Sequence, residues 1–288
     1  MIVVQLAVNG ILLGGLYLLM AQGLNLVFGV MKIVNLAHGV FIVVAGLVVY
    51  RLNDAYGVNP LLSALAVAPA FFVLGALLQR LLIERIKATG VQGELLSLML
   101  TYGLSYILIN VALRVFGAQY LSLPYLQSSL RIGSITIDES RLVASALAVL
   151  LAAALYVWLT YTPSGKQIRA TSQSTIGAVS CGIDTRRVRM IAFATGSALA
   201  AAAGTLLVVV RPVAPQLGDD FTVLSFVVIT LGGLGNYLGA ALGAFLLGSA
   251  QSFGGYYLGP TVESALPFVA MLLIMLIRPQ GLQPRVAR

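Results

Sequence analysis

Charged residues are scarce in this sequence of 288 residues: 9% are Asp, Glu, Lys or Arg, whereas roughly a quarter is typical of a soluble domain. Cysteine and histidine occur once each, as Cys181 and His38. A single cysteine excludes an internal disulfide, and a single histidine argues against a histidine-based metal site. Hydrophobic residues make up 59% of the chain. We therefore predict an all-α, polytopic membrane protein whose residues 1–288 form one transmembrane domain.

Carboxylates are missing from the middle of every apolar run, since all nine Asp and Glu fall in loops or at run ends. Proton- and sodium-coupled carriers usually need an intramembrane carboxylate or an unwound ion site. The nearest approach to an ATP-binding P-loop, SGKQ at 164–167, lacks the first glycine and the hydroxyl after the lysine. We therefore expect neither ion coupling nor ATP hydrolysis in this chain, and no enzyme activity. Active transport would then need energy from a partner.

Long apolar segments are abundant, and the first begins at Ile2 without the features of a cleaved signal. A helix needs about 20 residues to cross the hydrocarbon core. The second, seventh and last segments are short, which indicates tilted, broken or re-entrant helices. We expect about eight or nine spans. The nine apolar runs are approximately 3–29, 33–50, 60–83, 94–116, 141–161, 190–211, 221–238, 239–258 and 263–278.

The distribution of basic residues predicts the orientation of the chain. If the N-terminus is outside and every run crosses, twelve bases lie inside and five outside, and most acids lie outside. The positive-inside rule therefore favours an N-out, C-in orientation. It also explains the net charge of +8 without a nucleic-acid partner. The inside bases are Lys32, Arg80, Arg85, Lys87, Lys166, Arg169, Arg186, Arg187, Arg189, Arg278, Arg285 and Arg288, and the outside bases are Arg51, Arg114, Arg131, Arg141 and Arg211.

Two polar loops stand out between the apolar runs. The loop at about 162–189 is basic, and its segment 175–181 has helical spacing too short to span a membrane, with Gly182 as a stop signal. We predict a short amphipathic helix at the cytoplasmic surface, offered to a partner, with an ordinary positive-inside loop as the alternative. The largest outside segment, about 117–140, alternates apolar and polar residues and predicts a short hairpin. That hairpin could lie on the membrane, meet a soluble partner or be simply solvated.

Polar side chains within apolar runs are expensive and therefore indicate a structural or functional need. Gln22, Asn25, Asn35 and His38 form the first such group, with glycines between them. One interpretation is hydrogen bonding between helices; the other is a polar patch in a substrate pathway or at a broken helix. For His38, a structural hydrogen bond is a simpler explanation than catalysis or metal binding.

Glycine is concentrated near residue 235. Gly235, Gly239 and Gly243 recur every four residues, which predicts a shared helical face for close packing, favoured here against another subunit. Gly232, Gly233 and Gly235 would also weaken a helix just before Asn236. The alternative is therefore a helix broken at 232–235, with freed backbone groups lining a cavity.

Four stretches together resemble the permease subunits of branched-chain amino acid ABC importers, in particular the LivH-type subunit. They are GLNLVFGVMKIVNLAHG at 23–39, the loop and following run at 168–207, the glycine-rich VITLGGLGNYLGAALGAFLLG at 228–248, and RPQGL at 278–282. The resemblance covers nearly the whole chain. It implies a multi-pass protein of the cell inner membrane. It leaves the solute open among branched-chain amino acids, urea, short amides and aromatic acids.

The loop also resembles the EAA-type motif of ABC importers, in which an acid and two alanines are followed by a glycine. Those places read Ile176, Gly177, Ala178 and Gly182 here, so the acid is absent and a salt bridge from that position is not expected. The resemblance implies that this loop contacts the ATPase subunits. The residues expected to make this contact are Ala178, Gly182, Ile183, Asp184, Arg186 and Arg187, and those expected along the substrate path are Asn25, Asn35, His38 and Asn236.

The resemblance also implies a complex. A second, LivM-type permease subunit would pair with this chain, two ATP-binding cassette subunits would bind below it, and an extracytoplasmic substrate-binding protein would deliver the solute. ATP and Mg would belong to the ATPases, so no cofactor is expected in this chain. The competing hypothesis is an ATP-independent channel or facilitator, for which the basic loop would be dispensable.

Overall fold

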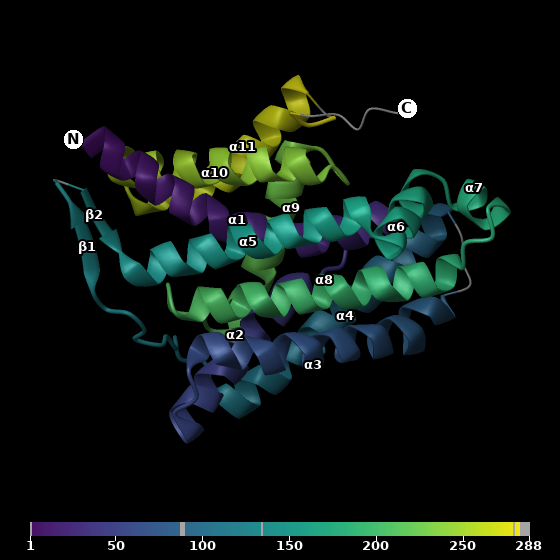
Figure 1. Ribbon diagram of the computed structural model, residues 1–288, viewed down its shortest axis with the longest axis horizontal. Helices are drawn as coiled ribbons and strands as arrows, with labels where there is room; N and C mark the ends of the chain where they lie inside the picture. The colour runs from purple at the N-terminus through teal and green to yellow at the C-terminus, as the bar shows by residue number, and fades with distance from the viewer. Residues whose placement is uncertain (1, 87–89, 134, 279, 283–288) are drawn as a thin grey trace.

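A computed structural model of the chain describes residues 2–86, 90–133, 135–278 and 280–282. Within these residues the fold is helical apart from one hairpin (Figure 1). The elements are α1 (Ile2–Met31), α2 (His38–Tyr56), α3 (Pro60–Leu81), η1 (Ile83–Arg85), α4 (Gly90–Phe116), β1 (Ser129–Ile132), β2 (Ile135–Asp138), α5 (Glu139–Tyr161), α6 (Pro163–Gln173), α7 (Thr175–Ser180), α8 (Thr185–Val208), η2 (Pro215–Leu217), α9 (Gly218–Gly232), α10 (Tyr237–Leu258) and α11 (Pro260–Ile277).

The predicted all-α membrane bundle is confirmed, and each of the nine apolar runs contains a helix. Among the described residues, seven helices are long and apolar enough to cross a membrane: α1, α2, α3, α4, α5, α8 and α11. The remaining two, α9 and α10, form a pair bent by 115° at a short break. The pair therefore counts as one broken span or one re-entrant loop, which brings the total to at most eight.

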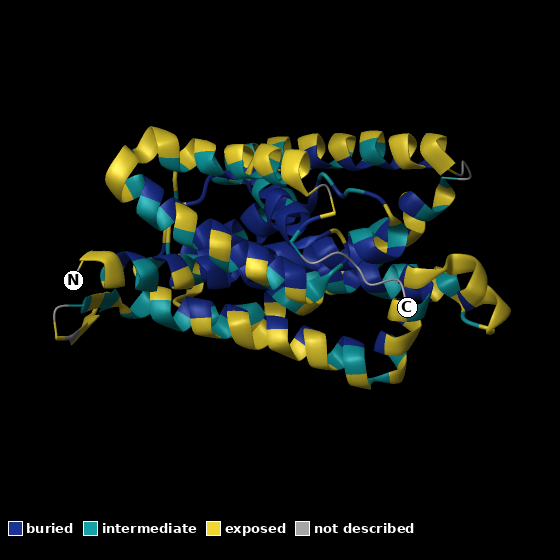
Figure 2. Cartoon of the chain, turned by 90° about the horizontal axis from the view of Figure 1, so that it is seen from above, coloured by how far each residue is buried: buried dark blue, intermediate teal, exposed yellow. Residues whose placement is uncertain are grey.

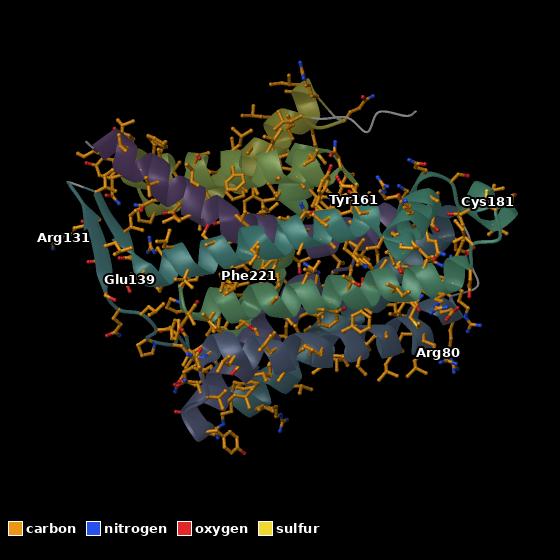
Figure 3. All side chains as sticks on the ribbon, in the orientation of Figure 1. Arg80, Arg131, Glu139, Tyr161, Cys181 and Phe221 are labelled. Carbon is orange, nitrogen blue, oxygen red and sulfur yellow. The ribbon has the colours of Figure 1, made fainter. Side chains whose placement is uncertain are left out.

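The bundle has two distinct ends (Figure 1). The N-terminus and the β1–β2 hairpin lie at one end, called here the hairpin end, and α6 and α7 lie at the other, called here the α7 end. α1, α3 and α5 run towards the α7 end, whereas α4 and α8 run back. Figure 3 places Arg131 and Glu139 at the hairpin end, and Arg80 and Cys181 at the α7 end.

The hairpin predicted in the 117–140 segment is present. β1 and β2 pair antiparallel, from Ser129 opposite Asp138 to Ile132 opposite Ile135. The Gln5 side chain of α1 donates to Thr136 O at 2.7 Å and accepts from Thr136 N at 2.9 Å, which ties the hairpin to the bundle.

The buried residues gather in the middle of the bundle (Figure 2). They include long stretches of α1 and α8. α8 is the most buried of the seven spanning helices, and α11 is the least. Many of the buried positions of α8 are alanine, and Gly204 lies against Ile42 O of α2. Small side chains allow such close contact between helices, which is how helices associate where lipid removes the hydrophobic driving force. The exposed apolar side chains of α3, α4 and α11 form the outer surface, as expected beside lipid.

Candidate functional site

The first break in the helical core lies between α1 and α2. His38, at the start of α2, lies beside Met20, with its Nε2 2.8 Å from Met20 O. Met20 is eleven residues before the end of α1 at Met31. At 1.5 Å per residue, the chain therefore turns back about 16 Å into the bundle before α2 begins. The short second apolar run is explained in this way, because α2 starts inside the bundle.

Hydroxyl groups from two distant helices form hydrogen bonds with the backbone N–H and C=O groups of this break. Leu36 N donates to Thr101 Oγ1 of α4 at 3.3 Å, and the Thr222 hydroxyl of α9 lies 3.1 Å from Leu36 O. Gly39 N donates to Thr222 Oγ1 at 2.8 Å, and Ala37 N donates to Asn35 Oδ1 at 3.1 Å. Unpaired backbone groups away from water are costly, so these side chains make irregular backbone tolerable here.

The second break separates α9 from α10, and amides of α1 hold it together. Asn25 Oδ1 accepts from Gly235 N at 2.8 Å, and Gln22 Nε2 donates to Tyr237 O at 2.9 Å. Asn236 Oδ1 accepts from Gly239 N at 3.0 Å and so caps the start of α10. The chain is therefore broken here, as in the alternative interpretation of the glycine-rich sequence at 232–235. α2 and α10 both begin inside the bundle, beside the same part of α1.

The four predicted path residues lie at these two breaks. Asn25, Asn35 and His38 are fully buried, and Asn236 is partly buried. Their hydrogen bonds show that each supports the local fold. Within the described part of the chain, buried polar atoms without a hydrogen-bond partner include Gln22 Oε1, Asn25 Nδ2 and His38 Nδ1. The passage of a solute beside them stays a prediction.

The glycines of α10 pack inside this chain. A Cβ on Gly243 would lie 2.8 Å from Val228 O, and Gly239 lies against Gly232. Both contacts are with α9, not with another subunit as the sequence favoured. Gly235 does not share their helical face, because it lies in the break with φ of 80°. That part of the prediction is wrong, since a four-residue spacing has no meaning where the chain has left the helix.

The short helix predicted in the 162–189 loop is α7. Ser174 Oγ accepts from Gly177 N at 3.0 Å at its start. Gly182 has φ of 76° just after its end, and Ile183 N donates back to Ala178 O at 3.0 Å. This left-handed turn satisfies a terminal carbonyl, as glycine does at many helix ends. The sequence therefore predicted both the helix and its stop.

Two apolar side chains of α7 are exposed. Ile176 is 82% exposed and Val179 is 56% exposed, whereas Ala178 is buried. Residues three apart on a helix are neighbours, so these two side chains form one small apolar surface outside the bundle. The sequence-based list of contact residues missed this pair, although its three-residue spacing in a polar loop was a usable signal.

The remaining predicted contact residues connect α7 to the bundle. Asp184 Oδ1 accepts from Arg186 N at 3.0 Å and from Arg187 N at 3.2 Å, which caps α8. The Arg186 guanidinium forms an ion pair with Glu84 of η1. The start of α8 is thus tied to the connection between α3 and α4.

These features define a polytopic membrane protein: a helical bundle whose core helices are interrupted, with an exposed helix at one end. The chain matches the family model for the permease component of branched-chain amino acid transport systems over residues 6–276. It belongs to this family, which consists of transport permease components and is not an enzyme family.

Sequence similarity to known permeases extends along nearly the whole chain. The high-affinity branched-chain amino acid permease LivH of Salmonella typhimurium is 29% identical over 96% of this chain and 94% of the relative. The branched-chain amino acid permease BraD of Pseudomonas aeruginosa is 27% identical over 98% of this chain and 95% of the relative. The permease LivM of Escherichia coli is 26% identical over 93% of this chain and 68% of the relative. A chain of PsaBC from Streptococcus pneumoniae in complex with Fab shares the fold, with a TM-score of 0.50 and 14% identity over 94% of this chain and 91% of that one.

Proposed function

We propose that this chain is the permease subunit of an ABC importer that moves a small amino acid or a related small polar solute across the cell inner membrane. Family membership and the names of the relatives support the solute class. The proposed coupling of transport to ATP hydrolysis rests on one observation. The apolar residues Ile176 and Val179 of α7 are exposed at one end of the bundle. Partner ATPases would bind α7 there.

The proposed assembly contains two permeases. Similarity to both LivH and LivM supports a pairing with a second, LivM-type chain. Two ATP-binding cassette subunits would supply ATP and Mg, and an extracytoplasmic binding protein would deliver the solute. ATP can drive transport only if the ATPases interact differently with two states of the permease. α7 is the element through which that difference would reach the bundle.

The charge distribution supports an orientation with the α7 end in the cytoplasm and the N-terminus outside. Of the bases assigned to the inside, Lys87, Arg285 and Arg288 lie outside the described residues. Alternation of the apolar runs assigns nine described bases to the inside and five to the outside. Figure 3 places Arg80 of the first group at the α7 end and Arg131 of the second group at the hairpin end. The nine are Lys32, Arg80, Arg85, Lys166, Arg169, Arg186, Arg187, Arg189 and Arg278, and the five are Arg51, Arg114, Arg131, Arg141 and Arg211.

The contacts of the loop suggest how movement would be transmitted. α6 precedes α7 and packs against α1, α5 and α8. α1 holds the α9–α10 break through Gln22 and Asn25. Displacement of α7 would therefore move α6 against the helix that holds the break. Changed hydrogen bonding at Asn25, Asn35, His38 and Asn236 would then open the path towards one side or the other.

The test is leucine uptake by the complex in proteoliposomes, measured with and without ATP. The proposal expects uptake to require ATP. Replacing both Ile176 and Val179 by serine should reduce uptake at least about tenfold, because a buried apolar pair contributes several kcal/mol to a contact. The matched control is Ser180→Ala on the same helix, which should transport normally. ATP-independent flux through this chain alone would establish the channel hypothesis instead.

A further inference from the structure

A cavity of about 450 Å³ lies at the hairpin end between α1, α5, α10 and α11. Sites for small ligands typically measure about 300–1,000 Å³. Its apolar lining comes largely from one helix, α1, through Leu6, Leu13 and Leu16. The cavity is separate from α7 and shares no residue with the predicted path.

The polar lining brings charges of opposite sign to this cavity. Arg141 at the start of α5 and Arg211 after α8 contribute guanidinium groups, and Glu263 of α11 contributes a carboxylate. Arg141 pairs with Asp138 at 3.2 Å, and the Arg211 guanidinium lies 5.5 Å from the centre of the Phe221 ring. Within the described ranges, neither Arg211 nor Glu263 forms an ion pair. α5 and α8 lie on one side of α1, and α10 and α11 on the other (Figure 1). The cavity therefore has a basic wall and an acidic wall.

The acidic wall holds a second acceptor. Gln251 is only 6% exposed, and its Nε2 donates to Glu263 O at 3.2 Å. Its Oε1 is buried and has no hydrogen-bond partner among the described residues. A Cβ on Gly255 would lie 2.5 Å from Glu263 Oε2, so the absence of a side chain there leaves room for the carboxylate. A primary ammonium, with three N–H donors, could use both acceptors.

We propose that this cavity binds an aliphatic α-amino acid as its zwitterion. Arg211 receives the carboxylate, Glu263 and Gln251 Oε1 receive the ammonium, and the aliphatic side chain lies along the leucines of α1. Charge-assisted hydrogen bonds of both signs give this arrangement its selectivity. The inference rests on the proposed function, in which the hairpin end faces the side from which the solute arrives.

The same chemistry decides among the solutes that the family resemblance leaves open. Urea and short amides carry neither charge, and an aromatic acid without an amino group lacks the ammonium. Each would leave at least one charged group of the cavity without a partner, which lowers affinity. A zwitterionic lipid headgroup has the same two charges, so the experiment must separate it from a free amino acid.

The experiment measures binding of tritiated L-leucine to the full chain in nanodiscs of phosphatidylglycerol alone. Isoamylamine lacks the carboxylate and 4-methylpentanoate lacks the ammonium, so each should compete at least about tenfold more weakly than leucine. Arg211→Gln should weaken leucine binding by about tenfold and leave isoamylamine unaffected. Glu263→Gln should also weaken leucine binding by about tenfold, and it should leave the binding of 4-methylpentanoate unchanged.

Two further variants sharpen the test. Arg131→Gln removes a positive charge from the hairpin at the same end but outside the cavity, and it should bind leucine normally. Gly255→Ala keeps every charge but displaces the Glu263 carboxylate, so leucine binding should weaken.

Three results would overturn the proposal. They are absent leucine binding by the unaltered chain, unchanged binding in both Arg211→Gln and Glu263→Gln, and loss of leucine binding when phosphatidylethanolamine is added, which would identify a lipid-headgroup site. Binding needs no ATP, so the proposed function is judged separately. If leucine binds but ATP does not drive its uptake, the proposed importer function is wrong. If ATP drives uptake and Arg211→Gln leaves that uptake unchanged, only the proposed binding site is wrong.

Discussion

Individual amide and hydroxyl groups hold the interrupted core of this permease together. Asn25 accepts from the backbone of Gly235, and the Thr222 hydroxyl contacts Leu36 and Gly39. Each contact joins segments far apart in the sequence. Because no water is available in the bilayer core, a lost partner leaves a buried N–H or C=O unsatisfied. Single substitutions at the breaks should therefore have large effects.

Asn25→Leu tests this at one residue. The change leaves Gly235 N without its acceptor, and we expect the free energy of unfolding to fall by about 1–3 kcal/mol. Thermal unfolding in detergent measures the loss. Asn110→Leu is the matched control, because Asn110 is exposed on α4 and donates only to Tyr106 O of its own helix. Equal stability of both variants would show that the break does not depend on Asn25.

Gly239→Leu tests the close packing of α10 on α9. Gly239 lies against Gly232, so a leucine side chain must push the two helices apart. We expect a loss of at least about 1–3 kcal/mol, or no folded protein, measured by size-exclusion chromatography and thermal unfolding. Gly103→Leu on α4 is the control, since nothing lies within 4 Å of a Cβ there. A well-folded Gly239→Leu protein would contradict the observed packing.

At the scale of elements, the apolar runs and turn residues predicted most of the fold. The nine helices within the runs, the hairpin, α7 and its stop at Gly182 all follow from local patterns. The direction of α10 does not, because a break of a few residues sets the 115° bend. The partners of the α1–α2 break could not be predicted either. Thr101 and Thr222 lie 65 and 186 residues from Leu36, and a threonine in an apolar helix has no distinctive local signal.

The candidate site likewise contains residues that the sequence predicted and residues that it could not predict. The residues at the two breaks were recognised because polar side chains are conspicuous in apolar runs. Gly235 was misplaced, since its spacing to Gly239 resembles a helical repeat although the chain bends there. The cavity at the hairpin end could not be predicted, because Arg211, Gln251 and Glu263 come from different elements.

Gly182→Val tests α7 as an element. Valine in the left-handed conformation costs at least about 1–2 kcal/mol, so the turn that ends α7 should change shape. We expect the assembled complex to hydrolyse ATP while leucine uptake falls at least about tenfold. The control is Gly182→Asn, because asparagine tolerates this conformation and should keep most of the uptake. Normal uptake by the valine variant would remove α7 from the coupling route.

At the scale of the whole molecule, Cys181 offers a direct test of orientation. It is the only cysteine in the sequence and is exposed at the α7 end. A membrane-impermeant maleimide should label it in inside-out vesicles and not in right-side-out vesicles. Combining Cys181→Ser with Arg131→Cys moves the thiol to the hairpin end and should reverse the pattern. Labelling of Cys181 from the outside would invert the proposed topology.

α1 starts at the hairpin end and runs towards the α7 end (Figure 1). Leu6 lines the cavity at the hairpin end, Gln22 and Asn25 hold the second break, and the same helix packs against α6. One continuous helix thus joins the cavity to the loop that carries α7. Thermodynamic linkage then works in both directions. If nucleotide binding beneath α7 changes the affinity of the cavity by some factor, occupation of the cavity changes the affinity for nucleotide by that same factor.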